Sequence, residues 1–76
     1  MRTGRNPFEE TAQKIPEDEP VFLIRGQDIC GPAVLNRYAE YAEMIGASTE
    51  LVKSVRDHAI RMQEWQLDHG GKVPDL

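Results

Sequence analysis

The chain has 76 residues, which suits one domain, and a domain this small buries only about 60% of the surface that its unfolded chain exposes. Its net charge of −4 argues against general nucleic-acid binding, which depends on clustered Lys and Arg. No apolar run is long enough to cross a membrane, and a single cysteine without a secretory signal favours the cytosol.

Self-association is the stabilising device that the composition leaves open. Small scaffolds usually need disulfides, a metal or oligomerisation. Cys30 is the only cysteine, so an intrachain disulfide is excluded. His58 and His69 stand apart without further soft ligands, so we predict no metal and no cofactor. The expected partner is therefore the protein itself, as a dimer or higher homo-oligomer.

Residues 1–19 form a predicted polar arm. Asn6 as cap and Pro7 at the first helical position allow a short helix over residues 7–14, although apolar residues are sparse there. The adjacent carboxylates of residues 17–19 repel one another and favour solvent. We expect a solvated arm here, with an acidic binding surface as the alternative.

A short β-strand is predicted over about residues 21–25, because this β-branched and aromatic run lies between Pro20 and Gly26. Both of its faces are apolar, and no second strand is predicted to pair with it. Pairing with a second copy is one interpretation, and an extended segment lying across the helices is the other. The expected oligomer interface consists of Val21, Phe22, Leu23, Ile24, Met62 and Trp65.

Two helices, about residues 32–45 and 49–69, are predicted as an antiparallel hairpin because the linker between them is very short. Pro32 begins the first helix, Gly46 ends it, and Ser48 caps the second. Residues 70–76 are expected to be a disordered tail. Apolar stripes follow helical spacing at Val34, Tyr38, Tyr41, Ala42 and Ile45, then at Leu51, Val55, His58, Met62, Trp65 and His69.

The candidate ligand-binding residues are Arg25, Gln27, Asp28, Tyr38 and Trp65. Arg25 follows an apolar run just before a helix, which suits a phosphate or carboxylate. The alternative is that Arg25 pairs with Asp28 or with the acidic arm. Tyr38 and Trp65 offer stacking surfaces, or alternatively plain packing. We read Cys30 as a small buried residue, and no nucleophile motif is present, so we predict a non-enzymatic protein.

The segment Glu19-Pro20-Val21-Phe22-Leu23-Ile24-Arg25-Gly26-Gln27-Asp28, followed by Pro32 and by Ala59 with Met62 and Trp65, resembles a group of small uncharacterised phage and prophage proteins. That group carries a Glu-Pro-x-Phe-x-Leu/Ile-Arg-x-x-Asp segment, a helical hairpin and a closing Met-x-x-Trp. The resemblance covers roughly residues 16–66. It implies a small cytosolic phage-type protein, a context in which many proteins counter host defence.

The sequence thus predicts a mainly α protein that assembles as a homo-oligomer, with a polar arm over residues 1–19 and a domain of strand and helical hairpin over residues 20–69. The expected function is a phage-type binding protein that sequesters a small anionic ligand, such as a signalling nucleotide, at an oligomer interface. The alternative is an inhibitor or adaptor that binds a host defence protein through the second helix and the acidic arm.

Overall fold

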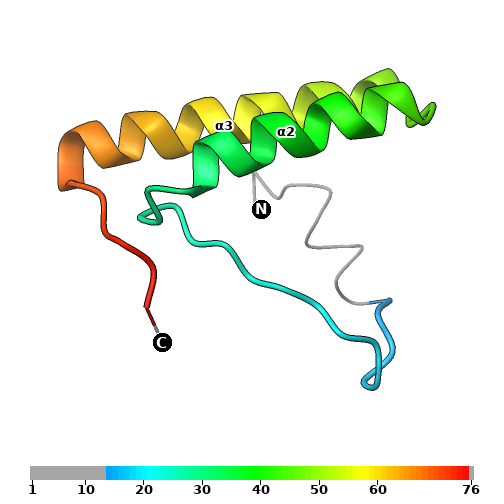
Figure 1. The fold of residues 1–76 in the computed structure, drawn as a ribbon, viewed down its shortest axis with the longest axis horizontal. Coiled ribbons are helices and arrows are strands. Elements are labelled where there is room, and N and C mark those ends of the chain that lie inside the picture. The colour runs from blue at the N-terminus through cyan, green and yellow to red at the C-terminus, as the bar shows by residue number, and fades with distance from the viewer. Residues whose placement is uncertain (1–13, 76) are drawn as a thin grey trace, which may run out of the picture.

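The described part of the chain is a hairpin of two helices with an extended segment on either side (Figure 1). The computed structural model describes residues 14–75. Helix α2 spans Gly31–Met44 and helix α3 spans Thr49–His69, side by side and antiparallel. The predicted hairpin is confirmed. The helix expected at residues 7–14 lies outside the described residues except for Lys14, which is in a turn.

The ends of α2 follow from local backbone chemistry. Pro32 stands in the first turn, where its missing N–H would have no helical partner. At the other end, Gly46 adopts φ +90°, and the Ala47 amide donates to the Ala42 carbonyl at 2.9 Å. This left-handed turn reverses the chain within a few residues and makes the antiparallel arrangement possible.

Helix α3 is capped as the sequence predicts. The Ser48 hydroxyl accepts a hydrogen bond from the Leu51 amide at 3.1 Å, and Glu50 lies in the positive first turn. Gly70, with φ +86°, ends the helix and turns the chain back toward the start of α2.

Ser48→Ala is expected to lower the free energy of unfolding by about 1 kcal/mol, because the Leu51 amide loses its acceptor. Urea unfolding followed by far-UV circular dichroism measures the change. Thr49→Ala, at the exposed neighbouring position, is the matched control and should stay within about 0.5 kcal/mol of the parent. Equal losses in the two variants would contradict a capping role for Ser48.

Small side chains form most of the hairpin core. Its buried apolar members are Ala39, Ala42, Val52, Val55, Ala59 and Met62. Alanines at the contact allow the two helices to approach closely, so a narrow stripe of each helix is enough to fill the space between them. Of the apolar stripe that the sequence marks on this helix, only Ala42 is buried, whereas Val34, Tyr38, Tyr41 and Ile45 are exposed.

The predicted strand over residues 21–25 is not formed; this segment is extended without regular secondary structure. A strand requires a neighbour for its backbone N–H and C=O groups, and within residues 14–75 no other segment pairs its backbone with residues 21–25. The described chain instead has one isolated parallel bridge, between Asp28 and Lys72.

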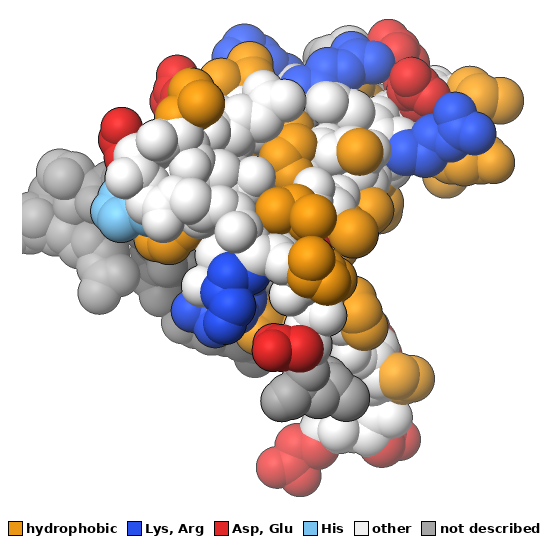
Figure 2. All heavy atoms as spheres, turned by 60° about the vertical axis from the view of Figure 1, so that its left-hand side comes forward, with side chains coloured by type: hydrophobic (Ala, Val, Ile, Leu, Met, Phe, Trp, Pro, Cys, Tyr) orange, Lys and Arg blue, Asp and Glu red, His pale blue; other side chains and the backbone are white. Residues whose placement is uncertain are grey.

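The segment that leads into α2 carries the most exposed aromatic side chain of the described chain. Phe22 is 88% exposed, and Val21 and Leu23 are also exposed. Figure 2 shows hydrophobic side chains over the main body of the molecule and on the narrower part that extends downward from this body. Neither described helix is apolar and long enough to cross a membrane.

Candidate functional site

The tail after α3 and the turn before α2 are joined by backbone hydrogen bonds. The Lys72 amide donates to the Gln27 carbonyl at 2.7 Å, and the Ile29 amide donates to the Lys72 carbonyl at 3.0 Å. The tail predicted to be disordered is therefore held in place at Lys72. Gly71 permits this approach, since a Cβ there would stand 2.5 Å from Ile29 Cγ2.

Gln66 connects the same turn to the last part of α3. Its Nε2 donates to the Gly26 and Asp28 carbonyls, both at 2.9 Å, in a partly buried position. Gly26 lies 40 positions before Gln66 in the chain, and Asp28 lies 38 positions before it. Gln66 thus holds the turn at a fixed position relative to α3, which orients the residues on either side of it.

Asp28 fixes the turn from within. Its Oδ1 accepts from the Cys30 amide at 2.8 Å, and its carbonyl accepts from the Gly31 amide at 2.9 Å. This local pattern is typical of Asp before a helix. Cys30 itself is exposed, which corrects the expectation that it is a small buried residue.

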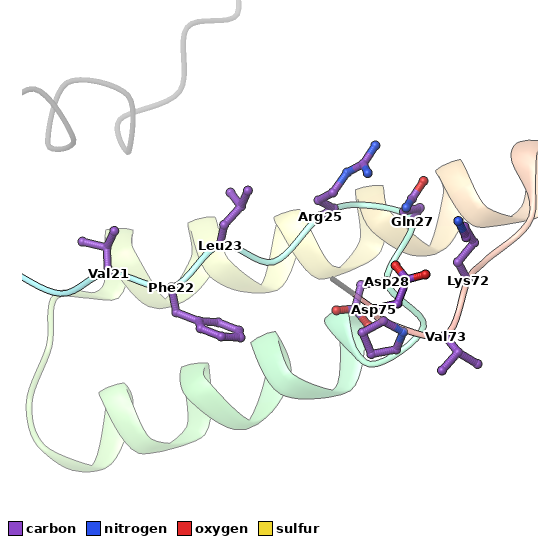
Figure 3. Close-up of a pocket in the computed structure, with 10 residues that line it drawn as sticks. Val21, Phe22, Leu23, Arg25, Gln27, Asp28, Lys72, Val73 and Asp75 are labelled. Carbon is purple, nitrogen blue, oxygen red and sulfur yellow. The ribbon is translucent and has the colours of Figure 1, made fainter.

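A groove of about 490 Å³ lies between the two extended segments (Figure 3). Its size falls within the range of about 300–1,000 Å³ that is usual for small-molecule sites. It is lined by Val21, Phe22, Leu23, Arg25, Gln27, Asp28, Lys72, Val73, Pro74 and Asp75. One side is therefore apolar, and charged side chains gather near the bridge that closes its end.

Two cations line the groove, Arg25 from the segment before α2 and Lys72 from the segment after α3. Figure 3 shows the side chains of Arg25 and Lys72 pointing to the same side of the chain, with Gln27 between them. Among residues 14–75 the ion pairs are Arg37 with Glu40, Lys53 with Asp57 and Arg56 with Glu43. Neither groove cation belongs to any of them, so the alternative pairing of Arg25 with Asp28 or residues 17–19 does not occur.

The structure brings three of the five expected ligand residues together: Arg25, Gln27 and Asp28 line the groove. Tyr38 lies instead on the exposed side of α2. Trp65 lies near the end of α3, where its ring stacks on His69 with centroids 4.1 Å apart. The His69 ring nitrogen Nδ1 also contacts the Trp65 carbonyl at 3.0 Å.

The expected interface residues separate in a similar way. Met62 is buried in the hairpin core and is not available to a partner, which corrects its assignment. Val21, Phe22 and Leu23 remain exposed, and Ile24 is partly covered.

Sequence reasoning missed Lys72, Val73, Pro74 and Asp75 in the groove, and Gln66 beneath it. No helical or strand periodicity marks these positions. The one local signal is Gly70-Gly71, which permits a chain reversal followed by a close backbone contact.

Comparisons with known proteins add no relative to this geometry. No protein-family model matches the chain, and neither a curated protein nor a solved structure matches it significantly. Among the described residues, no three or more His, Cys, Asp or Glu side chains are grouped as a metal site.

Proposed function

We propose that the protein is a non-enzymatic, phage-type binding protein that holds a small anionic ligand, such as a signalling nucleotide, in the groove beside Arg25 and Lys72. The observation that carries this proposal is that two cations without a carboxylate partner in the described chain line one groove. The phage context, counter-defence by sequestration and the host cytosol as location come from the resemblance over residues 16–66. The sequence predicts the ligand at an oligomer interface, whereas all residues of the groove proposed here come from one chain.

The groove supplies a distinct chemistry at each side. The planar Arg25 guanidinium suits two phosphate oxygens at once, and the Lys72 ammonium adds a second positive charge. Gln27 offers both a donor and an acceptor to a polar edge. The exposed Phe22 ring offers a stacking surface, and stacking on an aromatic side chain contributes about 1–3 kcal/mol per base.

Arg25→Ala is expected to weaken nucleotide binding by tenfold or more, because a hydrogen bond to a charged group contributes about 1.5–3 kcal/mol. Isothermal titration calorimetry against a panel of linear and cyclic nucleotides measures the affinity. Arg61→Ala removes the same charge from α3 outside the groove and should leave the affinity unchanged. The absence of heat with every nucleotide, or equal affinity in Arg25→Ala and the parent, would contradict the proposal.

A second candidate is an inhibitor or adaptor that binds a host defence protein. Ile60 and Leu67 favour it, because they are exposed and stand two turns apart on one side of α3. The exposed residues 17–19 add a negative surface suited to a basic partner. This candidate predicts one host protein in stoichiometric amount after purification from host cells, and its loss on both Leu67→Glu and charge reversal of residues 17–19.

A further inference from the structure

Helix α2 has a wider apolar surface than α3 covers. Its core contacts lie along Leu35, Ala39 and Ala42. A second apolar stripe, displaced by about a quarter of a turn at 100° per residue, remains exposed. We call it the α2 stripe; it consists of Val34, Tyr38, Tyr41 and Ile45, with Met44 at its rim.

Glu43 of α2 and Arg56 of α3 form an ion pair at 3.2 Å, and this pair marks the flank of the hairpin that does not carry the α2 stripe. Glu43 and the stripe lie on opposite sides of the α2 core contacts, because their positions differ by roughly half a turn. Arg56 therefore marks the opposite flank of the hairpin. By the same helical geometry, Leu51 and Trp65 of α3 lie on the stripe's flank.

The α2 stripe is self-complementary. Its four members follow a 4-3-4 spacing, and they read aliphatic, Tyr, Tyr, aliphatic in either direction. In an antiparallel pair of α2 helices, Val34 would face the partner subunit's Ile45, and Tyr38 would face the partner subunit's Tyr41. Antiparallel helices with heptad spacing pack in this way, with each a position of one helix against a d position of the other. A twofold axis generates this pairing from a single surface.

Charge and area also fit a second copy. Arg37 lies at the rim over the Tyr41 ring, 5.9 Å from its centroid, and pairs with Glu40 at 3.4 Å. In the antiparallel register Arg37 would lie opposite the partner subunit's Met44, so no like charges meet. Tyr38 and Tyr41 are 55% and 59% exposed. The whole α2 stripe offers on the order of 500 Å² of exposed surface, which is more than half of the ~800 Å² that each partner buries in a standard interface.

We propose that a second copy of this chain docks on the α2 stripe, so that two hairpins form an antiparallel four-helix bundle about a twofold axis. This geometry buries the tyrosines of both copies at the centre of the interface. It also gives a small protein with a largely alanine and valine core the additional buried surface that its size requires. The proposal does not rest on ligand binding in the groove.

The mass in solution tests the proposal. At micromolar concentration, sedimentation velocity of the full chain should give twice the mass of one chain, and Tyr38→Glu should give the mass of one chain with its helical circular dichroism retained. Leu67→Glu places the same charge at an exposed apolar position of α3 off the α2 stripe and should remain dimeric. A monomeric parent, or a dimer that survives Tyr38→Glu, would overturn the proposal.

Disulfide trapping tests the register independently of any destabilising charge. In a Cys30→Ser background, a mixture of the Tyr38→Cys and Tyr41→Cys chains should oxidise mainly to the mixed dimer, because these positions face each other across the twofold axis. Oxidation mainly to the two homodimers would contradict the antiparallel register. The Arg25→Ala variant should keep the dimer mass, which separates this result from failure of the groove.

Discussion

Gln66→Ala is expected to lower nucleotide affinity at least tenfold while leaving both helices intact. The variant removes the two hydrogen bonds that tie the Gly26 and Asp28 carbonyls to α3. The Gly26 carbonyl then loses its donor, and the Asp28 carbonyl keeps only the Gly31 amide. An unpaired, partly buried carbonyl costs about 1–3 kcal/mol, and the loss releases the turn that positions Arg25. Hydrogen exchange of the Ile29 and Lys72 amides, which bond across the same junction, should become faster.

Two further variants separate the hydrogen bonds of Gln66 from its size and its place on α3. Gln66→Glu keeps the shape but replaces the donor with an acceptor, so it should reproduce the loss of affinity. Gln63→Ala, one turn earlier at an exposed position, should leave both affinity and exchange unchanged. A Gln66→Glu protein that binds like the parent would contradict a role for these two bonds.

Met62→Ala is expected to lower the free energy of unfolding by about 2–5 kcal/mol. Met62 is buried in the core, and its Sδ packs against the start of α2, 2.9 Å from the place that a Cβ on Gly31 would occupy. Because small domains are stable by only about 5–15 kcal/mol, this loss is a large fraction of the total. Urea unfolding at a fixed protein concentration measures it.

Leu67→Ala is the matched control, since Leu67 is 86% exposed on α3 and lies outside the α2 stripe. Its own effect on the hairpin should stay within about 0.5 kcal/mol. Because Met62 lies in the core of one chain, its loss should not depend on protein concentration. A loss that vanishes on dilution would place Met62 at an interface between copies and contradict its position in the core.

The helices could be predicted because their signals are local. Pro32, Gly46 and Ser48 act on backbone groups within a few residues of themselves, and the predicted second helix matches α3 at both ends. The face that α2 buries was not predictable in the same way. Two apolar stripes run along this helix, and only contact with α3 determines that Ala39 and Ala42, rather than Tyr38 and Tyr41, lie inside.

The strand and the groove depend on contacts that periodicity does not encode. Residues 21–25 have the composition of a strand, but pairing requires a neighbour that the described chain does not provide. Arg25 could be proposed as an anion ligand from its position alone. Lys72 could not, because a reversal at Gly70 and the hydrogen bonds of Gln66 bring it to Arg25's groove from the far end of the chain.

The most direct test of the groove is an NMR titration of the isotope-labelled full chain with the nucleotide panel, followed through the backbone amides. Binding in the groove predicts that shifts concentrate at Arg25, Gln27 and Lys72, while the amides of Tyr38 and Trp65 stay in place. No shift with any nucleotide, or shifts confined to the helix positions, would contradict the proposed site.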